Sequence, residues 1–146
     1  DDSHAAVALE QAFDALRGAS EATTSTLRVA GRDIVIECSA GDVALVTFAE
    51  LCEAPLAARD YLAVAGKYAG IVMRGVPSFD DQNEASARRF MWLVDALYDR
   101  SRFLIVSAAT DIGSLYEGHH FAFEFSRTMS RLSEMTCRGK LFQTDI

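Results

Sequence analysis

The sequence predicts an α/β protein, with an α+β arrangement as the alternative, and two neighbouring observations support this fold class. Residues 84–99 have the apolar spacing of an amphipathic helix, carried by Phe90, Leu93, Val94, Leu97 and Tyr98. Residues 103–106 then form a short run that is apolar at every position, which is typical of a parallel strand covered on both faces. A helix leading directly into such a strand is half of a strand–helix–strand crossover.

Length and composition predict a single domain over residues 1–146. The net charge of −7 disfavours binding to nucleic acid. We expect no transmembrane segment, because no apolar run approaches the roughly 20 residues of a membrane span. We also expect no secretion signal. The three cysteines contain no C-x-x-C pair, which favours reduced thiols over a disulfide or a metal site.

The first part of the chain predicts a helix and then a β-meander. The N-terminal segment 1–20 is expected to be helical up to Gly18, with a cap at Asp1, Asp2 and Ser3. Polar residues 19–26 are expected to form a mobile loop. Antiparallel strands are predicted within 26–48, at 27–30, 33–38 and 43–48.

Residues 49–137 are expected to form the α/β portion of the chain. Thr47 and Glu50 have the spacing of a capping box and predict a short helix, and a second helix is expected at 56–66. The order then continues with a strand at 71–73, the helix at 84–99 and the strand at 103–106.

The region after the sheet is expected to begin with a short helix at 111–115 and a turn at 117–120. Phe121, Phe123 and Phe125 alternate with small or polar residues, which predicts a strand. A last short helix is expected at 128–135, and the tail 138–146 has no clear pattern.

Motifs for nucleotide binding and nucleophilic catalysis are missing from the sequence. A P-loop needs Gly-Lys followed by Ser or Thr, whereas Lys67 precedes a tyrosine and Lys140 precedes a leucine. No serine lies in a G-x-S-x-G elbow. We therefore predict no catalytic residue in this chain.

No metal site is predicted either. His119 and His120, flanked by Glu117 and Glu124, are adjacent ligand types in one turn, and no further ligands can be recognised. We interpret them as surface histidines. The acidic loop around Asp80, Asp81 and Glu84 lacks EF-hand spacing and is interpreted as solvated.

Four arginines are the candidate binding residues. They fall into two pairs beside predicted chain reversals: Arg88, Arg89, Arg127 and Arg131. Arginine suits bidentate contacts with carboxylates or phosphates. One interpretation is a set of salt bridges within the domain that fix helix orientation. The other is a phosphate site or a subunit interface. Asp95 is interpreted as part of a solvated or ion-paired helix face, and a Glu84–Arg88 helical ion pair is expected.

Five ordered motifs resemble the C-terminal part of the ZapE/AFG-type AAA+ ATPases. They are F-A-E-L-C-E-A-P-L-A-A-R-D-Y-L from Phe48, V-P from Val76, A-R-R-F-x-x-L-V-D-x-L-Y-D from Ala87, S-L-Y-E-G from Ser114 and F-E-F-x-R-T-x-S-R-L-x-E-M from Phe123. The resemblance extends to about Cys137 and departs from the family at Thr136-Cys137, where Gln-Ser is usual. Residues 138–146 have no match in the family pattern.

The resemblance implies a parent protein that binds ATP and Mg²⁺ and hydrolyses ATP, with its nucleotide motifs ahead of this region. This chain is then expected to bind no cofactor alone and to be inactive alone. The implied partners are the rest of the ATPase core, a second copy of the chain, or a cell-division or quality-control protein. The implied location is the cytoplasm, at the face of the inner membrane in bacteria, or the mitochondrion for a eukaryotic relative.

The order of strand 71–73, helix 84–99 and strand 103–106 also resembles a degenerate AAA+ half-core. Met73, Arg74 and Gly75 stand where the catalytic acids would be. This hypothesis requires the two strands to be adjacent and parallel. Two functions stay open: a non-catalytic module for packing, oligomerisation or partner recognition, and a domain that supplies arginines to a nucleotide site in cis or trans.

Overall fold

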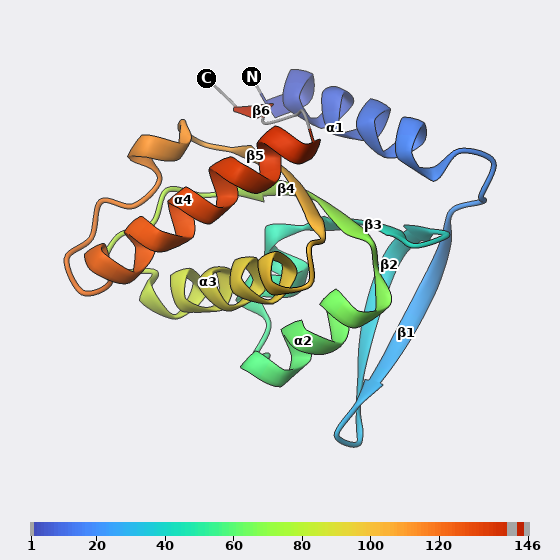
Figure 1. Ribbon diagram of the computed structural model, residues 1–146, viewed down its shortest axis with the longest axis horizontal. Helices are drawn as coiled ribbons and strands as arrows, with labels where there is room; N and C mark the ends of the chain where they lie inside the picture. The colour runs from blue at the N-terminus through green and yellow to red at the C-terminus, as the bar shows by residue number, and fades with distance from the viewer. Residues whose placement is uncertain (1, 140–142, 145–146) are drawn as a thin grey trace.

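The computed structural model describes residues 2–139 and 143–144, and in these residues a six-stranded sheet has helices on both faces (Figure 1). The helical elements are α1 (Asp2–Arg17), a π-helical turn η1 (Ala49–Glu53), α2 (Ala58–Lys67), α3 (Glu84–Asp99), a 3-10 turn η2 (Ile112–Ser114) and α4 (Ala122–Gly139). The strands are β1 (Thr23–Val29), β2 (Arg32–Ala40), β3 (Val43–Thr47), β4 (Gly70–Val76), β5 (Phe103–Ala108) and β6 (Gln143–Thr144). The strands are ordered in space as they are in the chain.

The predicted antiparallel meander is confirmed by the pairing of β1 with β2 and of β2 with β3. Ala30 and Gly31 both have positive φ, at 52° and 81°, as the tight turn of a hairpin requires. The expected loop over 19–26 is wrong in its second half, because β1 begins at Thr23. The Ser25 hydroxyl bonds the hydroxyls of Ser39 and Tyr68 at 2.9 and 2.6 Å, which holds this segment on the sheet.

The second half of the sheet is parallel, which confirms the predicted α/β class. β3 pairs with β4 and β4 pairs with β5, and Ile71 lies opposite Leu104 in the β4–β5 register. Val72 and Ile105 pack in a cluster with α1 on one face, whereas Ile71 and Leu104 belong to the main core on the other face. Both faces are therefore covered, as the unbroken apolar run predicted.

The helices are divided unequally between the two faces. α1 lies on one side of the sheet, and α2, α3 and α4 lie together on the other (Figure 1). The apolar stripe predicted for α3 faces the core, since Phe90, Leu93, Val94 and Leu97 are all fully buried. Among the described residues, no helix combines the length and the apolar character that crossing a bilayer needs.

The strand predicted over Phe121–Phe125 is wrong, because all but the first of these residues belong to α4. The buried side chains of this segment recur at helical spacing, namely Phe125, Thr128, Leu132 and Met135. Phe123 is 85% exposed, so its alternation with the other two phenylalanines does not reflect burial. The helix expected at 128–135 is the middle of this longer helix.

Other local predictions agree with the structure at most positions. The Glu50 backbone N–H donates to Thr47 Oγ1, and the Thr47 backbone N–H donates to Glu50 Oε1, both at 3.2 Å, which confirms the capping box. The helix expected at 111–115 is the 3-10 turn η2. The cap expected at Asp1, Asp2 and Ser3 depends on side chains that lie outside the described part of the chain. The Cys137 side chain and most of the tail 138–146 also lie outside it.

Candidate functional site

Two of the four candidate arginines meet a single carboxylate between α3 and α4. Arg131 Nη1 lies 2.6 Å from Asp95 Oδ1, and Arg127 Nη2 lies 3.4 Å from Asp95 Oδ2. Arg131 also stacks over Tyr98, with its guanidinium carbon 4.7 Å from the ring centroid. The Asp95 and Arg131 side chains are about one quarter exposed, whereas Arg127 is 60% exposed. This arrangement matches the interpretation in which Asp95 is ion-paired and fixes the orientation of two helices.

The other two arginines lie on α3 and have different surroundings. Arg89 is half-buried, and its Nη1 donates to the Cys52 carbonyl oxygen at 3.3 Å. Arg88 is exposed, and its guanidinium lies 5.0 Å from the ring centroid of Phe121, a cation–π contact. The predicted Glu84–Arg88 ion pair is wrong, because Glu84 pairs with His120 instead. Within the described residues, no carboxylate lies in ion-pair range of Arg88.

Arg88 borders three hollows on the surface, and Trp92 lines two of them. One of these two is lined by Arg88, Met91, Trp92, Asp95, His120, Phe121, Glu124 and Arg127. The other is lined by Leu56, Ala57, Ala85, Arg88, Arg89 and Trp92. We call the residues common to these two, Arg88 and Trp92, the α3 ridge. The half-exposed indole and the unpaired guanidinium of the ridge are side chains of the types enriched at protein interfaces.

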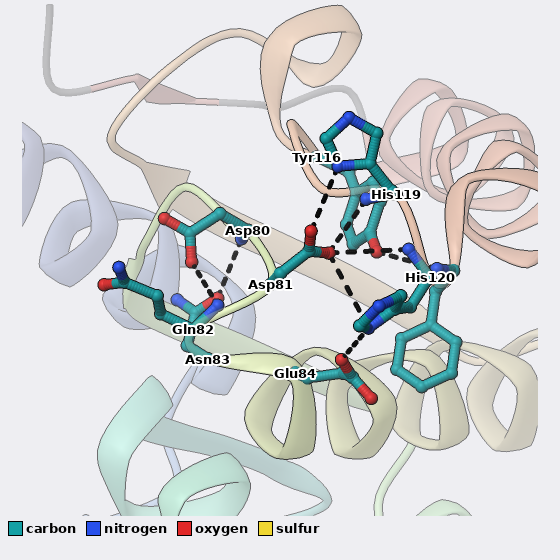
Figure 2. Close-up of polar contacts among 9 residues, drawn as sticks. Asp80, Asp81, Gln82, Asn83, Glu84, Tyr116, His119 and His120 are labelled. Atoms are coloured by element: carbon teal, nitrogen blue, oxygen red, sulfur yellow. Dashed lines mark hydrogen bonds and ion pairs between the residues drawn. The ribbon is translucent and has the colours of Figure 1, made fainter.

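A second group of polar side chains gathers where the loops after β4 and β5 meet (Figure 2). Asp81 Oδ1 accepts the backbone N–H of His119 at 2.8 Å and that of His120 at 3.4 Å. Asp81 Oδ2 lies 3.0 Å from His119 Nδ1, and Glu84 Oε2 contacts His120 Nδ1. The histidines are exposed, as predicted, and they contact Asp81 and Glu84, so two acids of the loop that was interpreted as solvated have histidine partners.

These contacts shift the proton affinities of the group. Hydrogen bonds from the backbone N–H and the imidazole of His119 lower the pKa of Asp81 to about 2. The hydrogen bond to Glu84, and then the negative charge of Glu84, raise the pKa of His120 above its ordinary value. Both shifts favour the charged forms, a carboxylate and an imidazolium.

Sequence reasoning missed this group because its acidic half and its histidine half are 35 or more positions apart. One usable signal was present. Both loops directly follow neighbouring parallel strands, and the carboxyl ends of such strands lie at the same edge of the sheet. The acidic loop after β4 and the histidine pair after β5 could therefore be expected to lie close together. Which acid contacts which histidine depends on packing and could not be predicted.

A model of the AFG1-like ATPase family matches residues 1–143 of the chain, which includes the α3 ridge, the Asp95 ion pairs and both loops. The chain belongs to the AFG1-like ATPase family. A similar protein is the cell division protein ZapE of Escherichia coli K12, which is 32% identical over 127 residues, covering 87% of this chain and 34% of ZapE. The lactation elevated protein 1 homolog B of Danio rerio is 32% identical over 109 residues, covering 75% of this chain and 22% of that protein.

This AFG1-like chain therefore spans about a third or less of the length of these relatives. No solved structure gives a significant match to it. The adjacency that the half-core hypothesis requires is present, because β4 and β5 are paired in parallel.

The half-core hypothesis concerns Met73, Arg74 and Gly75, of which the last two are exposed in this AFG1-like chain. Met73 is fully buried, and the β4–β5 register shifts between Met73 and Val76. Gly75 has a φ of 83°, and its backbone N–H donates to Ser107 Oγ at 3.1 Å. A bulge at this point re-aims the strand end, and the side chain of Met73 contributes to the main core.

Proposed function

We propose that this chain is the non-catalytic C-terminal module of an AFG1-like ATPase and that its α3 ridge packs against the rest of the ATPase core. The observation that carries the proposal is the contrast among the four candidate arginines. Arg127 and Arg131 are held on Asp95, and Arg89 is held on the Cys52 carbonyl, whereas Arg88 is exposed beside Trp92 without a carboxylate partner among the described residues.

The size of the relatives supports the rest of the core as the occupant. About two thirds of ZapE lies outside the matched region, and a surface that offers an indole beside an unpaired guanidinium suits an acidic, partly apolar face. A second copy of the chain, or a cell-division or quality-control protein, would require the same surface. We place the parent protein in the cytoplasm, with the inner-membrane face or the mitochondrion as the more specific locations in bacterial and eukaryotic members.

The alternative function, in which arginines of this chain reach the phosphates of a nucleotide in cis or trans, is less favoured by the geometry. Arg131 would have to leave a 2.6 Å ion pair and a cation–π contact. Arg127 has the weaker contact with Asp95 and the more exposed side chain, so it is the better of the two for that role.

The first test is a calorimetric titration of this chain with Mg-ATP and with Mg-ADP. We expect no binding heat. Micromolar binding that weakens in Arg127→Ala or Arg131→Ala would contradict the proposal and would establish the alternative function.

The second test uses a full-length ATPase that contains this segment. Arg88→Glu is expected to loosen the packing of this module on the remainder, seen as faster proteolytic separation of the two parts. Arg59→Glu, which reverses the charge of an exposed arginine on α2, is the matched control and is expected to have no effect. An Arg127→Ala variant that loses hydrolysis while staying assembled would favour the phosphate role instead.

A further inference from the structure

Ligand atoms of the kinds that hold transition metals converge at the meeting point of the two loops. One carboxylate oxygen each from Asp81 and Glu84 and one ring nitrogen of His120 all lie within 4.8 Å of one another. His119 Nδ1 lies beside them, 3.0 Å from Asp81 Oδ2. Figure 2 shows the Asp81 carboxylate between the His119 ring on one side and the contact of His120 with Glu84 on the other.

The loops that carry these residues are held together by their backbones. The Phe79 backbone N–H donates to the Leu115 carbonyl at 2.7 Å, and the Glu117 N–H donates to the Phe79 carbonyl at 2.7 Å. In the acidic loop, the Asp80 backbone N–H donates to Asn83 Oδ1 and the Asn83 amide donates to the Ser78 carbonyl. These contacts add to the hydrogen bonds that Asp81 accepts from the His119 and His120 backbones, so the loops are held together before an ion binds, as a preorganised site requires.

Gly118 shows that the backbone is shaped around the Asp81 carboxylate. A Cβ atom at this position would lie 2.7 Å from Asp81 Oδ1 and 2.8 Å from the Tyr116 hydroxyl oxygen. Any side chain would therefore displace the carboxylate or the hydroxyl that accepts the Phe121 backbone N–H at 2.7 Å. The loop approaches Asp81 as closely as a glycine allows.

An ordinary surface ion pair explains this arrangement poorly. Exposed pairs contribute little to stability, about 0–1 kcal/mol, and a single pair would need neither the second histidine nor the close approach at Gly118. The mixture of imidazole and carboxylate ligands is typical of zinc and related transition metals, whereas Mg²⁺ and Ca²⁺ take oxygen ligands. The Asp81 and Glu84 side chains are 37% and 33% exposed, so an ion can reach them from solvent.

We propose that Asp81, Glu84 and His120 bind a divalent transition metal of the zinc class. Such an ion would join the loop and first residue of α3 to the loop that precedes α4. Three protein ligands would leave the fourth position of a tetrahedral ion to water. Small side-chain rotations would bring the ligand atoms to the roughly 2.0–2.2 Å that zinc requires.

The test is a calorimetric titration of the metal-free chain with ZnCl₂ at neutral pH. We expect one ion per chain, with a dissociation constant raised at least about tenfold by Glu84→Gln and by His120→Gln, since even outer-shell changes at metal sites cost this much. Glu117→Gln and Glu124→Gln are the matched controls, because both acids flank the histidines and lie outside the cluster. They are expected to bind zinc as the unaltered chain does.

CoCl₂ provides a second readout that separates this site from the cysteines. Cobalt at Asp81, Glu84 and His120 should give visible absorption without the charge-transfer band of a thiolate ligand. The ligands lie in surface loops and at the first residue of α3, so the variants are expected to keep the fold, which circular dichroism checks. Asp81→Asn serves as a third variant. No zinc binding, a thiolate band, or equal losses in the control variants would overturn the proposal.

Discussion

Asp60 shows how one buried charge connects two parts of the fold. The side chain is completely buried, and its Oδ2 accepts from Arg32 Nη2 and from the Ala57 backbone N–H, both at 2.7 Å. Arg32 opens β2 at the hairpin, and Ala57 precedes α2. The Oδ1 atom has no hydrogen-bond partner within the described structure, so the carboxylate depends heavily on this one guanidinium.

Replacing Arg32 with alanine should therefore lower the free energy of unfolding by about 1–2 kcal/mol. A buried carboxylate that loses its partner is strongly destabilising, and the effect is reduced here because Arg32 is 44% exposed. The measurement is urea denaturation. Arg28→Ala is the control in the same hairpin, because the Arg28–Asp33 pair is exposed on both sides and should contribute almost nothing. Equal losses in both variants would contradict this account.

Ion-pair partners illustrate how far the sequence could go at this scale. The sequence predicted that Asp95 belongs to a solvated or ion-paired helix face, because the period of α3 directs it away from the core, and the structure shows the ion-paired alternative. It could not predict that Arg127 and Arg131 share this carboxylate, since that depends on where α4 crosses α3. Glu84 is the opposite case: local spacing favoured Arg88, and a loop more than thirty residues away supplied His120 instead.

At the scale of elements, Gly70 and Phe103 form a cross-strand pair at the start of the parallel sheet. The two residues are register partners in β4 and β5. A Cβ atom at Gly70 would lie 2.2 Å from the Phe103 ring, so the ring covers the bare backbone of its neighbour. This combination protects a glycine that would otherwise weaken the strand.

Gly70→Ala is expected to destabilise the protein by roughly 1–3 kcal/mol, because the ring must move or the strands must shift. Thermal unfolding followed by circular dichroism measures the effect. Gly66→Ala in α2 is the matched control, since its new Cβ would meet only the end of the Arg100 side chain at 3.7 Å. There the change should be neutral or stabilising by about 0.5 kcal/mol, as expected for glycine in a helix. A Gly70→Ala variant as stable as the unaltered chain would show that the ring moves freely.

The elements that the sequence predicted well have a single, strong period. α3 has the bounds that its apolar stripe predicted, and the two-sided strands β4 and β5 differ only by added residues at their ends. The start of α4 was predicted wrongly because its sequence fits both the strand period and the helix period. Three alternating phenylalanines suggested a strand, and only the burial of Phe125 beside the exposure of Phe123 reveals the helical period.

At the scale of the whole molecule, the order of elements was predictable as far as β5, and the layering was not. The buried apolar runs of β4 and β5 indicated that both faces of the sheet are covered. No local pattern indicated that α1 alone covers one of these faces. The short parallel strand β6 was likewise missed, because its pairing with β5 is decided by the chain path after α4. The roles of the four candidate arginines stay a prediction.

The rate at which Cys52 is chemically labelled measures how often the main core unfolds cooperatively. The Cys52 thiol is fully buried in the cluster shared by the sheet, α2 and α3, and burial raises its pKa above the ordinary value. Alkylation by iodoacetamide needs an exposed thiolate. We therefore expect Cys52 to be labelled only as fast as the core unfolds, whereas the half-buried Cys38 should react in the native state. Site-resolved mass spectrometry distinguishes them, and equal rates at the two cysteines would contradict a cooperative core.

The tight turn at Ala30 and Gly31 offers a practical point of attachment. The tip of the β1–β2 hairpin extends away from α3, α4 and the two loops that precede these helices (Figure 1). Both turn residues are exposed, and exposed hairpin tips tolerate inserted residues well. An epitope or a fluorophore placed there would allow the chain to be immobilised or tracked. The α3 ridge and the loop that contains His119 and His120 would stay accessible to solvent.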